Sequence, residues 1–363
     1  MKVEEVIKKI KEKNLDSFFV SSRANVFYLS HFSSSNAFIL LTQTEKFFIT
    51  DSRYYEAAKE VLKNWNVIQL GEKNKNQIDH LREILNEYGG EKVGFEEDRT
   101  TIAFYKKLVN KEGSKTESLK CQLVGFSGFF DQFRVSKTEE EIQIIKEAVK
   151  KTDRVFESIL PLIPSAKNEL DLRRMIINEI FLQGGTGESF PSIVASGKNS
   201  AIPHHETSYD PVEKNNPVLI DMGMVYKGYC SDFTRVIFYG EVDPEIEKIY
   251  QIVKEAHITA VEKVKAGISV REIDKAARDI IKKYGYGDYF LHSTGHGVGI
   301  EIHEPPRVSE KSEEILQENT VITIEPGIYI PHKGGVRLEN IVVVRKNRAE
   351  VLTETPLDQV VIG

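Results

Sequence analysis

Cysteine and long apolar runs are scarce in this chain. Only Cys121 and Cys230 occur among 363 residues, far apart in the sequence, which excludes the disulfide framework of small secreted proteins. The opening residues, Met1-Lys2-Val3-Glu4-Glu5, lack the apolar core of a signal peptide, and no run approaches the roughly 18 apolar residues of a membrane span. We therefore expect a cytoplasmic protein with no membrane partner.

An excess of positive charge is also missing. The formal net charge is −6 at pH 7, and lysines alternate with glutamates, as they do on solvated helix faces. Without a basic surface, no nucleic-acid partner is expected. The length of 363 residues exceeds what one hydrophobic core comfortably supports, and a hydrophobic content of 40% is enough for two cores.

The sequence predicts two domains, 1–125 and 138–363, joined by a linker over 126–137. In the first domain, helix-like and strand-like patterns alternate, which indicates a small α/β unit. The expected strands lie at 18–20, 37–41, 46–50, 67–70 and 92–95, and the expected helices at 3–10, 54–62 and 78–85. In the second domain, Thr138-Glu139-Glu140-Glu141 is typical of a capping box that opens a long helix.

The second domain contains two similar halves. Ile145-Lys146-Glu147-Ala148 recurs as Val253-Lys254-Glu255-Ala256, and Glu169-Leu170-Asp171 recurs as Glu272-Ile273-Asp274. Each copy is followed by glycine and a strand-rich stretch. Helix, helix and hairpin, twice over, predict an α+β domain with internal pseudo-twofold duplication.

The first hairpin places two aspartates together. Asp221 ends the apolar run 218–220, and Asp232 precedes the apolar return run 233–238. If Lys227-Gly228 is the turn, Asp232 lies opposite Gly223, and Asp221 then shares the face of Asp232 because side chains alternate along a strand. The two carboxylates would project together.

The second hairpin adds two glutamates and an arginine. The strand-like run 321–324 leads into Glu325, a turn region follows with Pro331 and Gly334-Gly335, and the return strand begins at 336–339. Arg337 and Glu339 share a face of that strand, because the side-chain period is two.

A glycine-rich segment, Gly295-His296-Gly297-Val298-Gly299, supplies an imidazole between the two hairpins. A cluster of four carboxylates would take up protons unless a cation neutralised it. Oxygen ligands with one imidazole suit Mn²⁺, Co²⁺ or Mg²⁺, whereas a structural zinc site favours thiolates. Two of the four acids could bridge a metal pair about 3.5–4 Å apart, the arrangement of many hydrolases.

These segments resemble the pita-bread metallopeptidases, the creatinase and methionine aminopeptidase superfamily. The motifs are 220–223, 231–235, 294–299, 324–327 and 337–340, and within the group the match is to aminopeptidase P and prolidase. The resemblance is strong over roughly 135–350. It is looser in the N-terminal part, where 23–32 and 50–54 are similar to the smaller α/β domain of creatinase type in that family.

The resemblance implies a ligand set of five residues for two divalent metal ions. Asp232 and Glu339 would bridge the ions, Asp221 would bind one of them, and His296 and Glu325 would bind the other. Mn²⁺ or Co²⁺ is expected, with Zn²⁺ as an alternative.

The resemblance also assigns residues that handle the substrate. His303 and His204 would hydrogen-bond the substrate or the developing oxyanion, and His292 would line the proline-side pocket. Glu325 would double as a proton shuttle, and Arg337 would orient Glu339 or meet the carboxylate side of the substrate. None of the three histidines His204, His292 and His303 is expected to bind metal. His205 is expected to be a bystander.

The function implied is removal of an N-terminal residue that precedes proline, so the expected partner is a peptide with proline at its second position. The expected activity is that of an Xaa-Pro aminopeptidase, and the alternative is an Xaa-Pro dipeptidase. A pita-bread binding module that has lost catalysis, a metal-free creatine hydrolase and a methionine aminopeptidase are more remote alternatives. The family also implies a homodimer.

Overall fold

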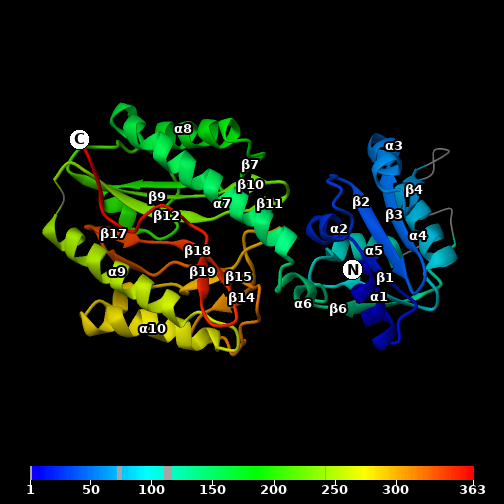
Figure 1. Ribbon diagram of the computed structural model, residues 1–363. Coiled ribbons are helices and arrows are strands. Elements are labelled where there is room, and N and C mark those ends of the chain that lie inside the picture. The colour runs from blue at the N-terminus through cyan, green and yellow to red at the C-terminus, as the bar shows by residue number, and fades with distance from the viewer. Residues whose placement is uncertain (1, 72–75, 110–116, 242) are drawn as a thin grey trace. The chain divides into compact units, whose positions relative to one another are not determined.

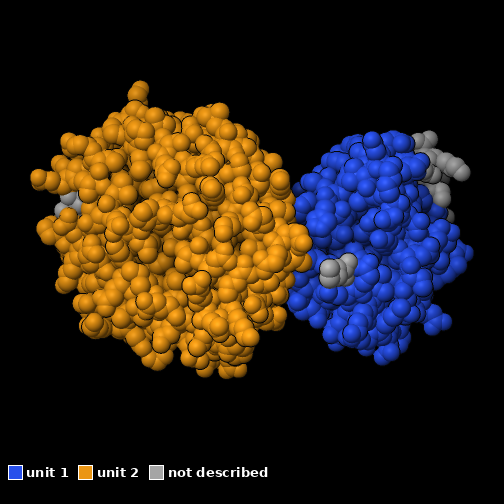
Figure 2. Space-filling view, viewed as in Figure 1, with its two compact units in different colours: residues 1–133 blue, residues 134–363 orange. Residues whose placement is uncertain are grey.

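A computed structural model describes residues 2–71, 76–109, 117–241 and 243–363. The chain forms two compact units, Met1–Phe133 and Arg134–Gly363 (Figure 2). The division falls inside the expected linker, and part of that stretch is regular structure, because α6 (Asp131–Arg134) lies within it. Among the described residues, no helix is both long and apolar enough to cross a membrane.

Unit 1 is built on a six-stranded sheet with the order β4-β3-β2-β1-β5-β6. Strand β1, in the interior of the sheet, pairs antiparallel with β2 and parallel with β5, so the sheet is mixed. Every strand and helix expected in this unit is present; the sequence did not predict α2, α5 and β6. The elements are α1 (Lys2–Glu12), β1 (Ser17–Val20), α2 (Arg23–Ser30), β2 (Ala37–Thr42), β3 (Lys46–Asp51), α3 (Ser52–Val61), β4 (Asn66–Leu70), α4 (Gln77–Tyr88), β5 (Lys92–Glu96), α5 (Ile102–Val109) and β6 (Gln122–Phe126).

Unit 2 opens with the long helix that the capping box predicts. The Thr138 hydroxyl accepts from the Glu141 backbone amide, and the Glu141 carboxylate accepts from the Thr138 amide. Two backbone amides at the start of the helix thereby gain acceptors. The helices of this unit are α7 (Glu139–Ile159), η2 (Leu160–Ser165), α8 (Glu169–Leu182), η3 (Gly197–Ala201), α9 (Pro244–Lys263), α10 (Val270–Lys283) and η4 (Gly287–Tyr289).

The strands of unit 2 lie between two pairs of helices (Figure 1). One core packs α7 and α8 against one face of the first hairpin. The other packs α9 and α10 against the second hairpin and against Leu219, Val236 and Phe238 of the first. The strands are β7 (Gly187–Glu188), β8 (Ile193–Ser196), β9 (Asn216–Met222), β10 (Met224–Tyr226), β11 (Tyr229–Cys230), β12 (Phe233–Tyr239), β13 (Gly295–Gly297), β14 (Glu304–Val308), β15 (Val321–Ile324), β16 (Gly327–Ile330), β17 (Gly334–Arg337), β18 (Asn340–Val344), β19 (Ala349–Val351) and β20 (Val360–Ile362). Helix pair followed by hairpin, twice over, is the expected duplicated α+β architecture.

The first hairpin turns at the predicted residues. Lys227 and Gly228 both have positive φ, at 49° and 82°, as a two-residue hairpin turn of the primed type requires. The pairs Val225 with Cys230 and Met222 with Phe233 follow one register on either side of a break. That register sets Gly223 opposite Asp232 at the break, as predicted.

The second hairpin has the same design. Ile324 pairs with Asn340, and Gly327 pairs with Arg337, again in one register with a break between them. The register sets Glu325 opposite Glu339 within this break. Their backbone amides bond elsewhere: Glu325 donates to the Thr294 carbonyl at 2.7 Å, and Glu339 donates to the Thr234 carbonyl at 3.2 Å. The second of these bonds joins the break of the second hairpin to β12 of the first, next to the break that contains Asp232.

Candidate metal centre

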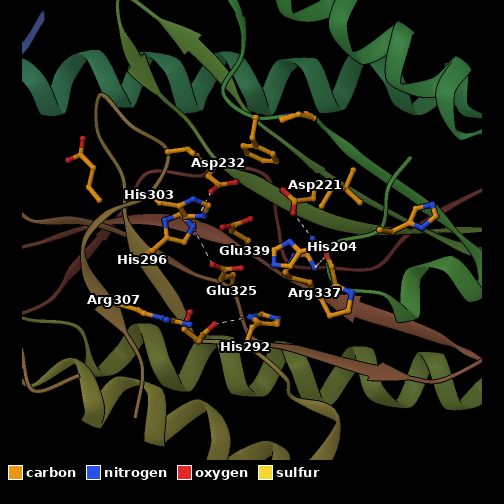
Figure 3. Close-up of a pocket in the computed structure, with 18 of the residues that line it drawn as sticks. His204, Asp221, Asp232, His292, His296, His303, Arg307, Glu325, Arg337 and Glu339 are labelled. Carbon is orange, nitrogen blue, oxygen red and sulfur yellow. Dashed lines mark hydrogen bonds and ion pairs between the residues drawn. The ribbon is translucent and has the colours of Figure 1, made fainter. Parts of the chain in front are cut away.

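The breaks in the two hairpins open onto one cavity of about 830 Å³ (Figure 3). The structure brings every predicted site residue to the wall of this cavity: Asp221, Asp232, His296, Glu325, Glu339, His204, His292, His303 and Arg337. They come from β9, β13, the ends of the broken ladders and the loops beside them. Strands more than a hundred residues apart therefore converge here.

The acids and one imidazole form a compact group. Ligand atoms of Asp232, His296 and Glu339 all lie within 4.8 Å of one another, which is close enough to hold a metal ion. His296 Nε2 lies 3.5 Å from Asp232 Oδ2 and 3.4 Å from Glu325 Oε1. The carboxylates of Asp232 and Glu339 are buried, at 5% and 1% exposure.

The carboxylates of the group carry more negative charge than the one nearby guanidinium, Arg337, can balance. Burial and the neighbouring carboxylates raise the pKa of Asp232 well above its usual value, and they do the same to Glu339. Among the described residues, Asp221 Oδ1 and Glu339 Oε1 are buried without a hydrogen-bond partner. Buried oxygens that point inward without a donor are the natural ligands of a hard divalent cation, so the residues present fit such an ion.

His296 is arranged as a neutral ligand. Its Nδ1 lies 3.0 Å from the Gly297 carbonyl, which can only accept, so Nδ1 carries the proton. Burial lowers the pKa of His296, which favours the uncharged ring. The unprotonated Nε2 therefore faces the carboxylates, and the backbone carbonyl fixes the ring orientation.

Three of the acids are held by specific donors. Thr234 Oγ1 donates to Glu339 Oε2 at 2.6 Å, and Thr323 Oγ1 donates to Glu325 Oε1 at 3.2 Å. Arg337 donates to Asp221 Oδ2 at 2.5 Å. One oxygen of each of these carboxylates is thereby oriented.

Arg337 is at the centre of a second network. We expected it to orient Glu339 or to meet the substrate; in the structure it pairs with Asp221 and reaches Glu339 only through Thr234, to which its Nε donates at 3.2 Å. It also donates to the Tyr329 hydroxyl at 2.8 Å and to the Pro203 carbonyl at 3.3 Å. Arg337, on the second hairpin, therefore bonds both the first hairpin and the loop that contains Pro203.

His292 uses both of its ring nitrogens within the protein. Nδ1 donates to the Ser293 carbonyl at 2.8 Å, so Nε2 accepts from the Tyr329 hydroxyl at 2.8 Å. Burial and the Arg337 cation lower the pKa of His292 to about 3. His292 thus presents its ring, rather than a proton, to the cavity.

The other two histidines are freer. His303 is exposed, and its ring stands edge-on to His296 with centroids 4.4 Å apart. His204 is also exposed, and its imidazole makes no hydrogen bond within the part of the chain that the structure describes. Both have donors to offer to a bound molecule.

Several residues of the site were not predicted from the sequence. Thr234 and Thr323 could have been found, because each lies two residues from a ligand and therefore shares its strand face. Tyr329 and Arg307 carry no such signal. Arg307 reaches the cavity because β13 and β14 pair His296 with Arg307.

Two known families match the two parts of the chain. A family model described as Metallopeptidase family M24 matches residues 143–346, and one described as Creatinase/Prolidase N-terminal domain matches residues 2–136. An uncharacterized peptidase of Bacillus subtilis, YqhT, is 34% identical over 362 residues and 100% of both chains. The Xaa-Pro dipeptidase of Pyrococcus furiosus is 37% identical over 355 residues and 98% of both chains.

Solved structures agree with these matches. An Xaa-Pro dipeptidase from Bacillus anthracis superposes with a TM-score of 0.92 at 36% identity, covering 99% of both chains. An X-Pro aminopeptidase from Thermotoga maritima superposes with a TM-score of 0.88 at 34% identity, covering 96% of this chain and 98% of its own.

Proposed function

Because the chain belongs to metallopeptidase family M24, we propose that its cavity binds two divalent metal ions and hydrolyses the peptide bond between an N-terminal residue and proline. The observation that carries this proposal is the convergence of four carboxylates and one neutral imidazole on one cavity. Two of the carboxylate oxygens, Asp221 Oδ1 and Glu339 Oε1, are buried and have no donor among the described residues. Relatives named Xaa-Pro dipeptidase or aminopeptidase over the full chain support the proline specificity.

Asp232 and Glu339 would bridge the two ions, Asp221 would be a ligand of one ion, and His296 and Glu325 would be ligands of the other. When bound, the ions would supply an activated water and a Lewis acid for the scissile carbonyl. Mn²⁺ or Co²⁺ suits this mixture of oxygens and one nitrogen, with Zn²⁺ as an alternative.

The chain's own groups would bind and orient the peptide. His204 and His303 reach the cavity with ring nitrogens that can donate to a developing oxyanion. Glu325 Oε2 has no hydrogen bond from any described residue and can carry a proton from water to the leaving nitrogen. His292 and Tyr329, locked to each other, would form a wall that positions a proline ring.

The sequence favoured the aminopeptidase; one observation favours the dipeptidase as a second candidate. Arg307 lines the cavity beside His292 (Figure 3), its side chain is exposed, and it forms no ion pair with any described residue. A guanidinium in this setting matches the free carboxylate of a proline that ends the substrate.

The test compares Ala-Pro, Ala-Pro-Ala and Ala-Ala-Ala as substrates of the protein reconstituted with Mn²⁺ or Co²⁺, beside a chelated control. Release of alanine from Ala-Pro-Ala establishes the aminopeptidase, and cleavage of Ala-Pro alone establishes the dipeptidase. Cleavage of Ala-Ala-Ala at the same rate contradicts the proline specificity.

An Arg307→Met variant refines the second candidate. If Arg307 receives the proline carboxylate, the variant raises KM for Ala-Pro far more than KM for Ala-Pro-Ala-amide. Arg271→Met is the matched control, because Arg271 is an exposed arginine outside the cavity. Equal changes for both substrates remove the dipeptidase argument.

Two further expectations belong to this proposal: a homodimer and a cytoplasmic location. Light scattering coupled to size-exclusion chromatography tests the first, and cell fractionation tests the second.

A further inference from the structure

The loop that carries His204 has little regular structure of its own. After β8, the chain forms the short helix η3 and then an irregular stretch up to residue 211. His204 lines the cavity from this loop, yet its imidazole makes no hydrogen bond with any described residue. The position of the ring is therefore set by the backbone that presents it.

That backbone gathers around one carboxylate. Glu169 is the first residue of α8 and is fully buried at 0% exposure. Its Oε1 accepts from the Ser196 amide at 2.8 Å and from Asn199 Nδ2 at 2.9 Å. Its Oε2 accepts from the amide and hydroxyl of Ser208, each at 3.1 Å.

The remaining donor is the residue next to His204. His205 Nε2 lies 2.7 Å from Glu169 Oε2. The sequence indicated that His205 is a bystander, but this contact makes it the side chain that fastens the centre of the loop. In addition, the α8 amides of Glu169 and Leu170 donate to the carbonyls of Asp210 and Ser208, each at 3.0 Å.

We propose that Glu169, with His205 as its central partner, is a positioning residue that holds His204 in the cavity. The five donors come from both ends and the middle of the loop, so one buried carboxylate connects residues 196, 199, 205 and 208. A buried carboxylate with all of its donors is rigid, and loss of one partner leaves the others unsatisfied. Other anchors act at single points of the loop: Arg337 donates to the Pro203 carbonyl, the Gly335 amide donates to Ser200 Oγ, and Thr207 Oγ1 donates to the Ser192 carbonyl.

The proposal rests on the proposed function, in which His204 contacts the substrate, and a double-mutant cycle tests it. The variants are Glu169→Gln, His204→Ala and the pair combined, assayed on the Xaa-Pro substrate that the parent cleaves. Glu169→Gln is expected to lower kcat about 10- to 100-fold, the cost of a misplaced contact group. In the His204→Ala background, the same change should lower kcat by less than about twofold, because residues that act together are not additive.

Glu96→Gln is the matched control. Glu96 is also a buried carboxylate that collects several donors, the amides of Ser21 and Ser22, the Ser22 hydroxyl and Asn25 Nδ2, but it lies in unit 1 and does not line the cavity. The control should lose stability without losing kcat. A kcat loss in Glu169→Gln that multiplies with His204→Ala, or no kcat loss at all, overturns the proposal.

Two measurements keep the test decisive. If Glu169→Gln does not fold, His205→Gln and Ser208→Ala each remove part of the network, and the same cycle applies to them. If the parent cleaves no Xaa-Pro substrate, the proposed function has failed, but the position of His204 can still be read from the imidazole signals of ¹⁵N-histidine protein loaded with diamagnetic Zn²⁺. The His204 signals should shift or broaden in Glu169→Gln and not in Glu96→Gln; unchanged signals in both overturn the proposal.

Discussion

The two hairpins of unit 2 share one design but carry their acids at different positions. In both, a break in the ladder precedes the return strand, and the last residue before that strand is an acid: Asp232 before β12 and Glu339 before β18. The residue facing it is Gly223 in the first hairpin and Glu325 in the second. The same backbone device therefore yields one acid in one half and an opposed pair in the other.

Packing explains the difference. A Cβ on Gly223 would lie 2.1 Å from the Ser231 carbonyl oxygen and 2.2 Å from Ser189 Oγ, so no side chain fits there. The first half supplies its second acid from within the ladder instead, at Asp221, opposite Thr234. A duplicated frame thus fixes where ligands can stand, and local packing decides which positions carry them.

A second contrast concerns the loops that bring histidines to the cavity. The His204 loop in the first half is held by Glu169 through amides, a hydroxyl and His205. The His303 loop in the second half is held by Glu304, which pairs with the cations of Arg134 and Lys137. The first anchor depends mainly on neutral donors, and the second depends on charge.

Removing the equivalent acids, Asp232 and Glu339, tests the comparison of the hairpins with the largest expected effect. Asp232→Ala and Glu339→Ala should each lower metal occupancy and nearly abolish turnover, because a bridging carboxylate neutralises charge on both ions. Metal content by mass spectrometry and kcat are the measurements. Glu206→Ala, an exposed acid on the His204 loop, is the control and should change neither; equal occupancy in all three variants contradicts the bridging roles.

The contrast between loop anchors predicts a pH dependence. Burial acts to raise the pKa of Glu304, but the Lys137 and Arg134 cations outweigh burial and lower this pKa to about 2. A depressed carboxyl pKa stabilises the fold above the unfolded value near 4.5, and this stabilisation is lost as pH falls toward 2. Between the two pKa values, the ionised Glu304 contributes of order 3 kcal/mol to the free energy of unfolding.

Glu304→Gln tests this expectation. Urea unfolding from pH 7 down to pH 3 should show the parent losing its stability advantage over the variant as the pH falls. A difference between parent and variant that stays constant with pH would exclude the charged anchor.

Gly223→Ala tests the packing argument. Because the new methyl group meets backbone rather than a flexible side chain, the free energy of unfolding should fall by about 2 kcal/mol. Metal occupancy should fall with it, since Asp232 lies directly across the break. Thermal unfolding and metal titration measure the two effects, and a variant as stable as the parent contradicts the packing argument.

The smallest effect concerns the threonines that orient the acids. Thr234→Val removes the 2.6 Å bond to buried Glu339 and should weaken metal binding about tenfold. Thr323→Val removes a longer bond, 3.2 Å, to Glu325 and should weaken it less. Competition with a fluorescent chelator ranks the two variants, and the reverse order would mean that the second hairpin is the more dependent on its threonine.

Local patterns explain why much of this site was predictable. The turn at Lys227-Gly228 and the side-chain period of two were enough to set Asp221 and Asp232 on one face, and Thr138 with Glu141 marked the start of α7. The grouping of both hairpins and His296 around two ions came from resemblance, and the metal roles stay predictions. Periodicity cannot report that Glu339 donates its amide to Thr234 or that His205 reaches Glu169, because these contacts join segments whose approach depends on the packing of whole helices.

The C-terminal segment closes the first half of unit 2. β20 pairs parallel with β12, and Arg235 on β12 donates to the carbonyls of Thr355 and Pro356. During translation, the hairpin that bears Asp221 and Asp232 must therefore wait for residues 355–362 before its sheet is complete. Unit 1 can fold while the ribosome is still at work, since domains fold in the order in which they emerge. Metal loading then becomes a step of maturation that follows synthesis of these residues, and a stalled or truncated chain would carry a folded unit 1 beside an unfinished metal centre.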